Sequence, residues 1–134
     1  MMLEKEGKRL HLIISNNSEI PIYQQIKEQI KDEILRGELS DGEMLPSIRG
    51  LANEINVSVL TTKRAYDELV AEGFIHAIQG KGFFVAVKNL DVLKEGKMKE
   101  IEEKLQEAIA LSDMIGLEGK ELMTMLEILL EDKI

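Results

Sequence analysis

The sequence predicts an α+β fold that is mainly helical, and three observations lead to this class. Two short segments before residue 73 place apolar residues at helical spacing on either side of a tight turn. A β-prone hairpin with glycines at its tip follows over residues 74–87. The last 45 residues return to helical spacing in a highly charged background. We therefore expect a winged helix-turn-helix domain over residues 1–88, which begins with an N-terminal arm over residues 1–19, and a C-terminal helical hairpin over residues 89–134.

A first helix is expected between Pro21 and Gly37. Pro21 suits the first position of a helix, and apolar residues recur behind it at steps of three and four. The apolar stripe consists of Tyr23, Ile26, Ile30 and Ile34. The opposite face, which we interpret as a solvated surface, consists of Lys27, Glu28, Lys31, Asp32 and Glu33. Before this helix, the β-prone run Leu10–Ile14 leaves two interpretations open: an isolated strand against the hairpin, or an ordered arm without function.

The next two helices are each opened by a serine. Ser47 provides an N-cap for a helix that should end near Glu54, and Ser58 caps a second helix that should continue to Glu72, before Gly73. The buried face of the second helix should consist of Thr62, Ala65, Tyr66 and Leu69. Its outward face should consist of Val59, Leu60, Lys63, Arg64 and Asp67, so its beginning is expected to be cationic.

The hairpin should pair Phe74–Gln79 with Phe83–Val87 across a turn of Gly80, Lys81 and Gly82. Its tip needs glycine because a tight hairpin requires positive φ angles, and small residues let a backbone come close to a groove of DNA. Two interpretations of Lys81 are open: a cation that reaches the minor groove or a phosphate, or a side chain that is simply exposed to solvent.

The composition limits the class of protein. A chain of 134 residues with 44% hydrophobic content can hold one small domain plus an accessory element. It contains no cysteine, and no apolar run approaches the ~20 residues of a membrane span. The first ten residues carry charges rather than the hydrophobic region of a signal peptide, so we expect a cytoplasmic protein.

The net charge of −8 argues against DNA binding if it is taken as one number, because affinity for DNA depends on neutralising phosphates. Its distribution changes this conclusion. Residues 1–88 contain 11 Lys and Arg against 13 Asp and Glu, whereas residues 89–134 contain 6 against 12. The segments Ile55–Tyr66 and Phe74–Leu90 contain no acidic residue. Their basic residues are Lys63, Arg64, Lys81 and Lys88, so a locally positive surface is expected on an acidic protein.

The sequence contains no arrangement that is typical of catalysis. His11 and His76 are isolated, with no cysteine and no paired carboxylates at ligand spacing, so we expect neither a metal site nor a cofactor. No glycine-rich phosphate loop follows a strand, and the carboxylates are scattered along polar helix faces. We therefore expect a binding protein rather than an enzyme.

Residues at matching spacing over some 65 positions carry a family resemblance. The first group consists of Pro21, Tyr23, Gln25, Ile26, Leu45, Pro46, Ser47, Arg49, Leu51 and Ala52. The second consists of Val57, Ser58, Thr61, Arg64, Ala65, Tyr66, Leu69, Glu72, Gly73, Gln79, Gly80, Lys81, Gly82, Phe84 and Val85. This pattern resembles the DNA-binding domain of GntR-type bacterial transcription regulators. The chain departs from it at Val59, where the family usually has arginine, and at Phe83, where threonine is usual.

The resemblance implies a set of DNA contacts. The predicted DNA-binding residues are Arg49, Ser58, Val59, Thr61, Lys63, Arg64, Gln79, Gly80 and Lys81. The cap at Ser58 would aim free backbone N–H groups and the positive end of the helix dipole at a phosphate. Arg64 matches a common arginine of the family, and a contact with the DNA backbone alone is open for it. Val59 is limited to apolar contact, such as with a thymine methyl group, so we expect an altered operator preference.

Two interpretations of Arg49 are open. Its guanidinium matches phosphate oxygens and the O6 and N7 atoms of guanine in a bidentate geometry, which favours a DNA contact. Alternatively, it is a surface arginine that pairs with Glu54 or Glu28.

The tail should form two helices separated by a break at Gly116–Gly119. Apolar residues at helical spacing are Met98, Ile101, Leu105, Ala108, Ile109 and Ile115, and then Leu122, Met125, Leu126 and Leu129. Two helices so apolar cannot bury their faces in each other alone, so a second chain is implied. Packing onto the winged domain of the same chain is the alternative. The predicted dimerisation residues are Ile101, Leu105, Ile109, Leu122, Met125, Leu126 and Leu129.

So short a tail resembles the YtrA-type branch of the family, which implies a homodimeric repressor of a transport (ABC transporter) operon and of its own gene. A two-fold dimer would bind a pseudo-palindromic operator with half-sites roughly 34–36 Å apart, or a multiple of this. An unknown small-molecule effector could bind in the core around Met98, Met123 and Met125, or these residues could simply fill the core. The competing function is a winged-helix protein-interaction module without sequence-specific DNA binding.

Overall fold

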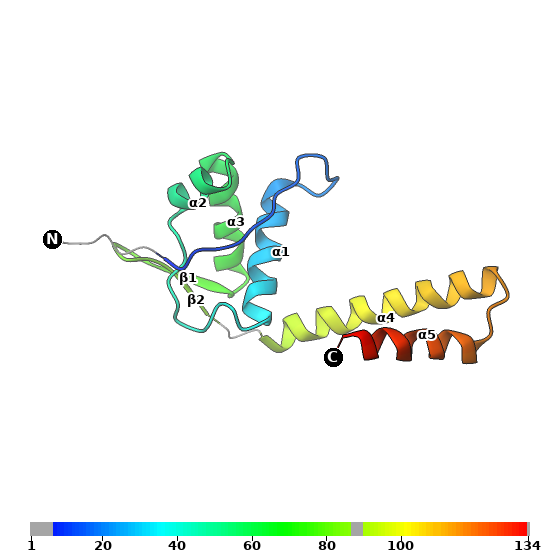
Figure 1. The fold of residues 1–134 in the computed structure, drawn as a ribbon. Coiled ribbons are helices and arrows are strands. Elements are labelled where there is room, and N and C mark those ends of the chain that lie inside the picture. Colours follow the sequence, from blue (N-terminus) through cyan, green and yellow to red (C-terminus); the bar gives the residue numbers. More distant parts are fainter. Residues whose placement is uncertain (1–6, 87–89, 134) are drawn as a thin grey trace. The chain divides into compact units, whose positions relative to one another are not determined.

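The computed structural model describes residues 7–86 and 90–133. Its elements are α1 (Ile22–Leu35), α2 (Ile48–Glu54), α3 (Val59–Ala71), β1 (Ile75–Ile78), β2 (Gly82–Val85), α4 (Leu90–Met114) and α5 (Gly119–Asp132) (Figure 1). The chain divides into two compact units, Met1–Leu93 and Lys94–Ile134. The domain boundary predicted between residues 88 and 89, and with it Lys88, lies outside the described residues.

The core of the first unit lies where α3 packs against α1, α2 and β1. The predicted stripe of α1 is buried at Ile26, Ile30 and Ile34, and Tyr23 packs against the cluster. The predicted inner face of α3, which consists of Thr62, Ala65, Tyr66 and Leu69, is buried as well. The helical spacing of apolar residues therefore predicted both packing faces correctly.

Both predicted serine caps are confirmed. Ser47 Oγ accepts a hydrogen bond from the Gly50 N–H at 3.0 Å, and Ser58 Oγ accepts one from the Thr61 N–H at 3.0 Å. Between the two helices, Asn56 adopts a φ of 55°, which asparagine tolerates better than most residues. These local interactions set where α2 and α3 begin and make the turn that joins them.

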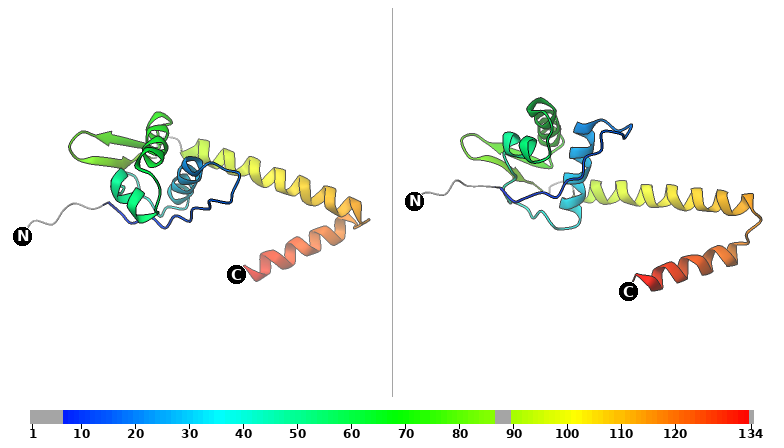
Figure 2. Two further views of the ribbon diagram at one scale, coloured as in Figure 1. Left: turned by 90° about the horizontal axis from the view of Figure 1, so that it is seen from above. Right: turned by 45° about the horizontal axis from the view of Figure 1, so that its top comes forward.

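The wing is a two-stranded antiparallel hairpin that extends away from the three helices (Figures 1 and 2). Its register pairs Ile75 with Val85 and Ile78 with Gly82. The strands are shorter than predicted, and Val87 lies outside the described residues. The loop before α2 lies along the other edge of β2, where the Leu45 N–H donates to the Phe83 carbonyl and the Val85 N–H donates to the Glu43 carbonyl.

The prediction that Leu10–Ile14 could form a strand against the wing is wrong. This segment lies along α1, where the side-chain amide of Gln29 bonds both backbone groups of Ile13 at 2.8 and 2.7 Å. The amide of Gln25 bonds both backbone groups of Ser15 in the same way. Residues 10–15 are therefore ordered, because glutamine amides satisfy the backbone of Ile13 and Ser15 and the loop before α2 already occupies the free edge of β2.

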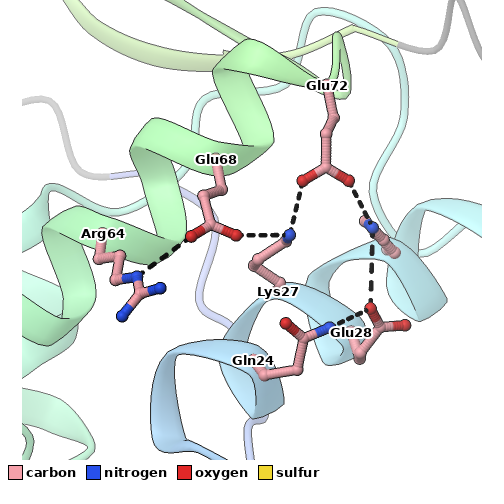
Figure 3. Close-up of polar contacts among 7 residues, drawn as sticks. Gln24, Lys27, Glu28, Arg64, Glu68 and Glu72 are labelled. Atoms are coloured by element: carbon pink, nitrogen blue, oxygen red, sulfur yellow. Dashed lines mark hydrogen bonds and ion pairs between the residues drawn. The ribbon is translucent and has the colours of Figure 1, made fainter.

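The interpretation of the polar face of α1 as a solvated surface is wrong at Lys27 and Glu33, which are both buried. Lys27 Nζ lies 2.8 Å from Glu68 Oε1 and 2.5 Å from Glu72 Oε2, and Lys31 Nζ lies 2.9 Å from Glu72 Oε1 (Figure 3). Burial disfavours the charged amine, but the hydrogen bonds that it donates to Glu68 and Glu72, together with the negative charge of both carboxylates, outweigh burial and raise the pKa of Lys27. A carboxylate on α3, Glu68, and one at its C-cap, Glu72, thus allow a lysine on this face to be buried.

The two predicted helices of the tail are α4 and α5, and the second unit contains α5 and the part of α4 from Lys94 onward. They are joined by a turn in which Gly116 adopts a φ of 71° and the Leu117 N–H donates to the Ser112 carbonyl. No residue of α5 is buried, and the exposed apolar side chains include those at Ile101, Leu105, Ile109, Met125, Leu126 and Leu129. Leu122 is half-buried. Across the described ranges, no helix is both long and apolar enough to cross a membrane.

Candidate nucleic-acid interface

The beginning of α3 is held rigidly and presents its first turn to solvent. Ser58 Oγ accepts the Thr61 N–H and also donates to Thr61 Oγ1 at 2.8 Å, so the cap locks both side chains. Ser58, Val59 and Leu60 are exposed, and Thr61 is half-buried. The positive end of a 13-residue helix therefore faces outward, where it could receive an anion such as a phosphate.

Lys63 and Arg64 are exposed on the next turn, but each is paired with an acid one turn further along. Lys63 Nζ lies 2.7 Å from Asp67 Oδ2, and Arg64 Nε lies 3.1 Å from Glu68 Oε2. The Arg64 guanidinium also lies over the ring of Tyr23, 3.7 Å from its centroid. The predicted cationic start of the helix is thus partly neutralised by its own acids.

Arg49 is exposed on α2, and the alternative that it pairs with Glu54 or Glu28 is wrong. Glu54 instead binds Arg9, with 2.8 Å between Oε1 and Nε, and Glu28 lies near Lys31. Within residues 7–86, the guanidinium of Arg49 has no ion-pair or hydrogen-bond partner. Its five N–H donors therefore remain available to a ligand that carries paired oxygen acceptors.

The wing tip has the geometry that its glycines predicted. Gly80 and Gly82 adopt φ angles of 76° and 123°, and the Lys81 N–H closes the turn on the Ile78 carbonyl at 2.9 Å. Gln79 and Lys81 are exposed, and the Lys81 amine contacts no carboxylate in the part of the domain that the structure describes. The tip thus carries a solvent-exposed cation that has no ion-pair partner within residues 7–86.

The comparisons with known proteins bear on what this surface does. The sequence model described as "Bacterial regulatory proteins, gntR family" matches residues 22–85, which contain α1, α2, α3 and the wing. The HTH-type transcriptional repressor YtrA of Bacillus subtilis (strain 168) is 38% identical over 109 residues, which cover 81% of this chain and 84% of that protein. This chain belongs to the GntR family.

Two solved structures resemble this GntR-family chain. YtrA from Sulfolobus acidocaldarius, a GntR-family transcription factor, is 37% identical, with 69% of this chain and 97% of that chain covered and a TM-score of 0.56. AraR(DBD) in complex with operator ORX1 is 29% identical, with 59% of this chain and 99% of that chain covered and a TM-score of 0.52. The winged-helix fold and the similarity to YtrA that the sequence predicted are confirmed, and the protein is a DNA-binding transcriptional regulator rather than an enzyme.

The GntR-family domain also has a feature that the sequence analysis missed. A groove of about 570 Å³ lies between the N-terminal arm, the loop before α2 and the wing, and its lining includes Arg9, Ser47 and Lys81. Gly7 lies so close to the backbone of Leu45 that a Cβ atom would approach its carbonyl carbon to 2.1 Å. No local sequence signal distinguishes this part of the arm from a frayed terminus.

Proposed function

We propose that this GntR-family protein represses transcription by occupying an operator as a homodimer. In this proposal α3 enters the major groove and the wing contacts flanking DNA. The single observation that supports it most directly is the pairing of the basic residues. Of the nine Lys and Arg residues in the described range 7–86, seven form ion pairs with carboxylates, while Arg49 and Lys81 do not.

Unpaired cations are the groups that gain most from a phosphate. A cation that already pairs with a carboxylate must give up that partner before it can neutralise DNA, whereas Arg49 and Lys81 need not. They come from α2 and from the wing, on either side of α3 in the sequence. We assign them contacts with phosphate oxygens or base edges, and we assign the exposed cap at Ser58 a contact with a backbone phosphate.

The remaining predicted residues have supporting roles in this proposal. Thr61 and Lys63 lie on the first two turns of α3, where a recognition helix meets base edges. Gly80 lets the wing backbone approach the flanking groove because it has no side chain, and the exposed amide of Gln79 is assigned a contact beside it. Arg64, held over Tyr23 and paired with Glu68, is assigned a contact with the DNA backbone.

The dimer would form through the second unit. The exposed apolar side chains of α4 and α5 support this part of the proposal, because contiguous apolar surface of this kind is normally covered by a partner. A second copy of the chain is the partner that also supplies a second recognition helix, as a pseudo-palindromic operator requires. Met98, Met123 and Met125 would fill the core of this interface. The alternative role for these three side chains is to line a site for an unknown small-molecule effector in the same dimer.

The proposed targets rest on similarity alone. The resemblance to the YtrA-type branch supports a transport (ABC transporter) operon and the protein's own gene as the regulated units. Repression by occupancy needs no catalytic group, and action on operator DNA implies that the protein works in the cytoplasm.

The proposal is tested by measuring binding of the purified protein to its own promoter fragment and to random duplex across a salt series. Preference for the promoter, with log affinity falling linearly in log salt, is the expected result for a regulator that makes several phosphate contacts. Equal binding to both duplexes would contradict autoregulation. No binding at low salt would contradict the DNA-binding function and favour a protein-interaction module.

A further inference from the structure

The first turn of α3 presents two adjacent apolar side chains to solvent. Leu60 is 77% exposed and Val59 is 40% exposed. A single exposed apolar side chain needs no explanation, because folded proteins have many. These two, however, occupy the turn that directly follows the cap at Ser58, where a recognition helix meets base edges.

The polar side chains around them are largely engaged within the protein. The hydroxyl of Ser58 both donates to and accepts from Thr61, Lys63 pairs with Asp67, and Arg64 pairs with Glu68. A shallow hollow beside this turn is lined by Tyr23, Leu60, Thr61, Lys63, Arg64, Asp67 and Glu68. The first turn of α3 therefore presents apolar side chains to solvent, and the polar side chains of Ser58, Lys63 and Arg64 beside it are already engaged.

DNA presents one apolar feature on the base edges of the major groove, the C5-methyl group of thymine. Valine and leucine side chains have no donor or acceptor, so they can distinguish bases there only through this methyl group. We propose that Val59 and Leu60 make α3 a thymine reader, in which each packs against a thymine methyl group of the operator half-site. This inference rests on the proposed function, since it requires α3 to lie in the major groove.

Deoxyuridine provides a direct probe, because it lacks the methyl group and keeps every hydrogen-bonding group of thymine. The operator is first located by footprinting on the promoter fragment or, if that fragment is not bound specifically, by selection from random duplexes. Each thymine is then replaced singly by deoxyuridine. At one or two thymines per half-site we expect affinity to fall about fourfold, the equivalent of ~0.8 kcal/mol for one buried methyl-sized group.

Two variants of the full-length protein assign the effect to its side chains. Leu60→Ala should weaken binding to the thymine operator and remove the sensitivity to deoxyuridine at one position, and Val59→Ala should do so at another. Leu60→Ala should unfold at the temperature of the wild type, because the side chain is exposed and alanine favours a helix. Lys81→Ala is the matched control: it should weaken binding to both operators by the same factor.

The outcomes separate this inference from the function on which it rests. If no duplex is bound with sequence preference, the proposed function fails and thymine reading fails with it. If one operator is bound specifically but deoxyuridine changes nothing at any position, only the thymine reading is overturned. Equal sensitivity to deoxyuridine in the wild type and in both alanine variants would also overturn it, because the methyl group would then contact other residues.

Discussion

The hydroxyl of Tyr66, on α3, donates a hydrogen bond of 2.8 Å to the carbonyl oxygen of Pro46, the residue before the N-cap of α2. The Tyr66 ring also meets the Phe83 ring of the wing edge-to-face, with 4.9 Å between centroids. One buried side chain thus joins the recognition helix to the start of α2 and to β2. Arg49 lies on α2, and Lys81 lies in the turn that precedes β2.

Removing the Tyr66 hydroxyl should weaken the contact between α3 and the start of α2 without creating a cavity in the hydrophobic core. Tyr66→Phe keeps the ring and loses one hydrogen bond, so we expect the free energy of unfolding to fall by about 1 kcal/mol. Chemical denaturation measures the change. Tyr23→Phe, on the half-buried Tyr23, serves as a comparison and should change stability less. Equal losses in the two variants would contradict a specific role for the bond to Pro46.

Lys27 should contribute more to stability than any exposed cation. Lys27→Ala leaves Glu68 and Glu72 without their shared partner on α1, and we expect a loss of about 1–3 kcal/mol, less than for a fully buried pair because both carboxylates are partly exposed. Lys63→Ala breaks only an exposed pair on one helix and should cost about 0.5 kcal/mol or less. Urea unfolding of both variants at one salt concentration measures the two losses in the free energy of unfolding. Similar losses would refute the larger contribution of Lys27.

Ionisation of Glu33 should lower the free energy of unfolding, whereas ionisation of a carboxyl that is paired with a cation raises it. Burial raises the pKa of its carboxyl, and Glu33 Oε2 has no hydrogen-bond partner among the described residues. Because the folded state binds this proton more tightly than the unfolded state, the buried charge destabilises the fold above the folded pKa, and this penalty disappears as the pH falls through it. We expect Glu33→Gln to raise the melting temperature at neutral pH, with a gain that shrinks in acid. A gain independent of pH would show that the charge is not its cause.

The two unpaired cations should contribute to DNA affinity through phosphates. Arg49→Ala and Lys81→Ala should each weaken binding and reduce the slope of log affinity against log salt by about 1 for each phosphate that the variant no longer neutralises. Arg36→Ala is the matched control, because Arg36 already pairs with Glu38. Fluorescence anisotropy across a salt series measures both quantities. An unchanged slope in the first two variants would place these residues outside the interface.

The apolar faces of the tail should hold two chains together. Leu105→Glu on α4 and Leu126→Glu on α5 place a charge on surfaces that the proposed dimer would bury, so we expect monomers by sedimentation and weaker operator binding. Ile13→Glu, in the N-terminal arm, is the control, since its side chain is exposed in the other unit and should leave the dimer intact. A dimer that survives both changes in the tail would refute this interface.

The elements near the candidate interface could be predicted because short-range interactions determine them. The caps at Ser47 and Ser58 bond to residues three positions along, and the glycines of the wing tip are required by the local φ angles. The buried face of α3 follows from helical geometry alone, since Thr62, Ala65, Tyr66 and Leu69 recur at steps of three and four.

The arm shows where such prediction fails. Leu10–Ile14 has the composition of a strand, but composition does not predict which groups its backbone will hydrogen-bond to. In the folded domain the edge of β2 is already occupied by the loop before α2, while Gln25 and Gln29 on α1 offer side-chain amides. The competition among these partners depends on distances that exist only after α1 and the wing have packed.

The sequence by itself determined the family, the helix boundaries near the interface and the basic residues that could contact DNA, because motif spacing, caps and periodicity act over a few residues. Only the tertiary structure decided which of those cations are available. Lys27 can be buried because Glu68, 41 positions away, comes within 2.8 Å of it. Arg49 has no ion-pair partner within residues 7–86, where Glu54 binds Arg9 instead. Charge pairing over such separations requires packed helices, and a linear pattern does not contain that information.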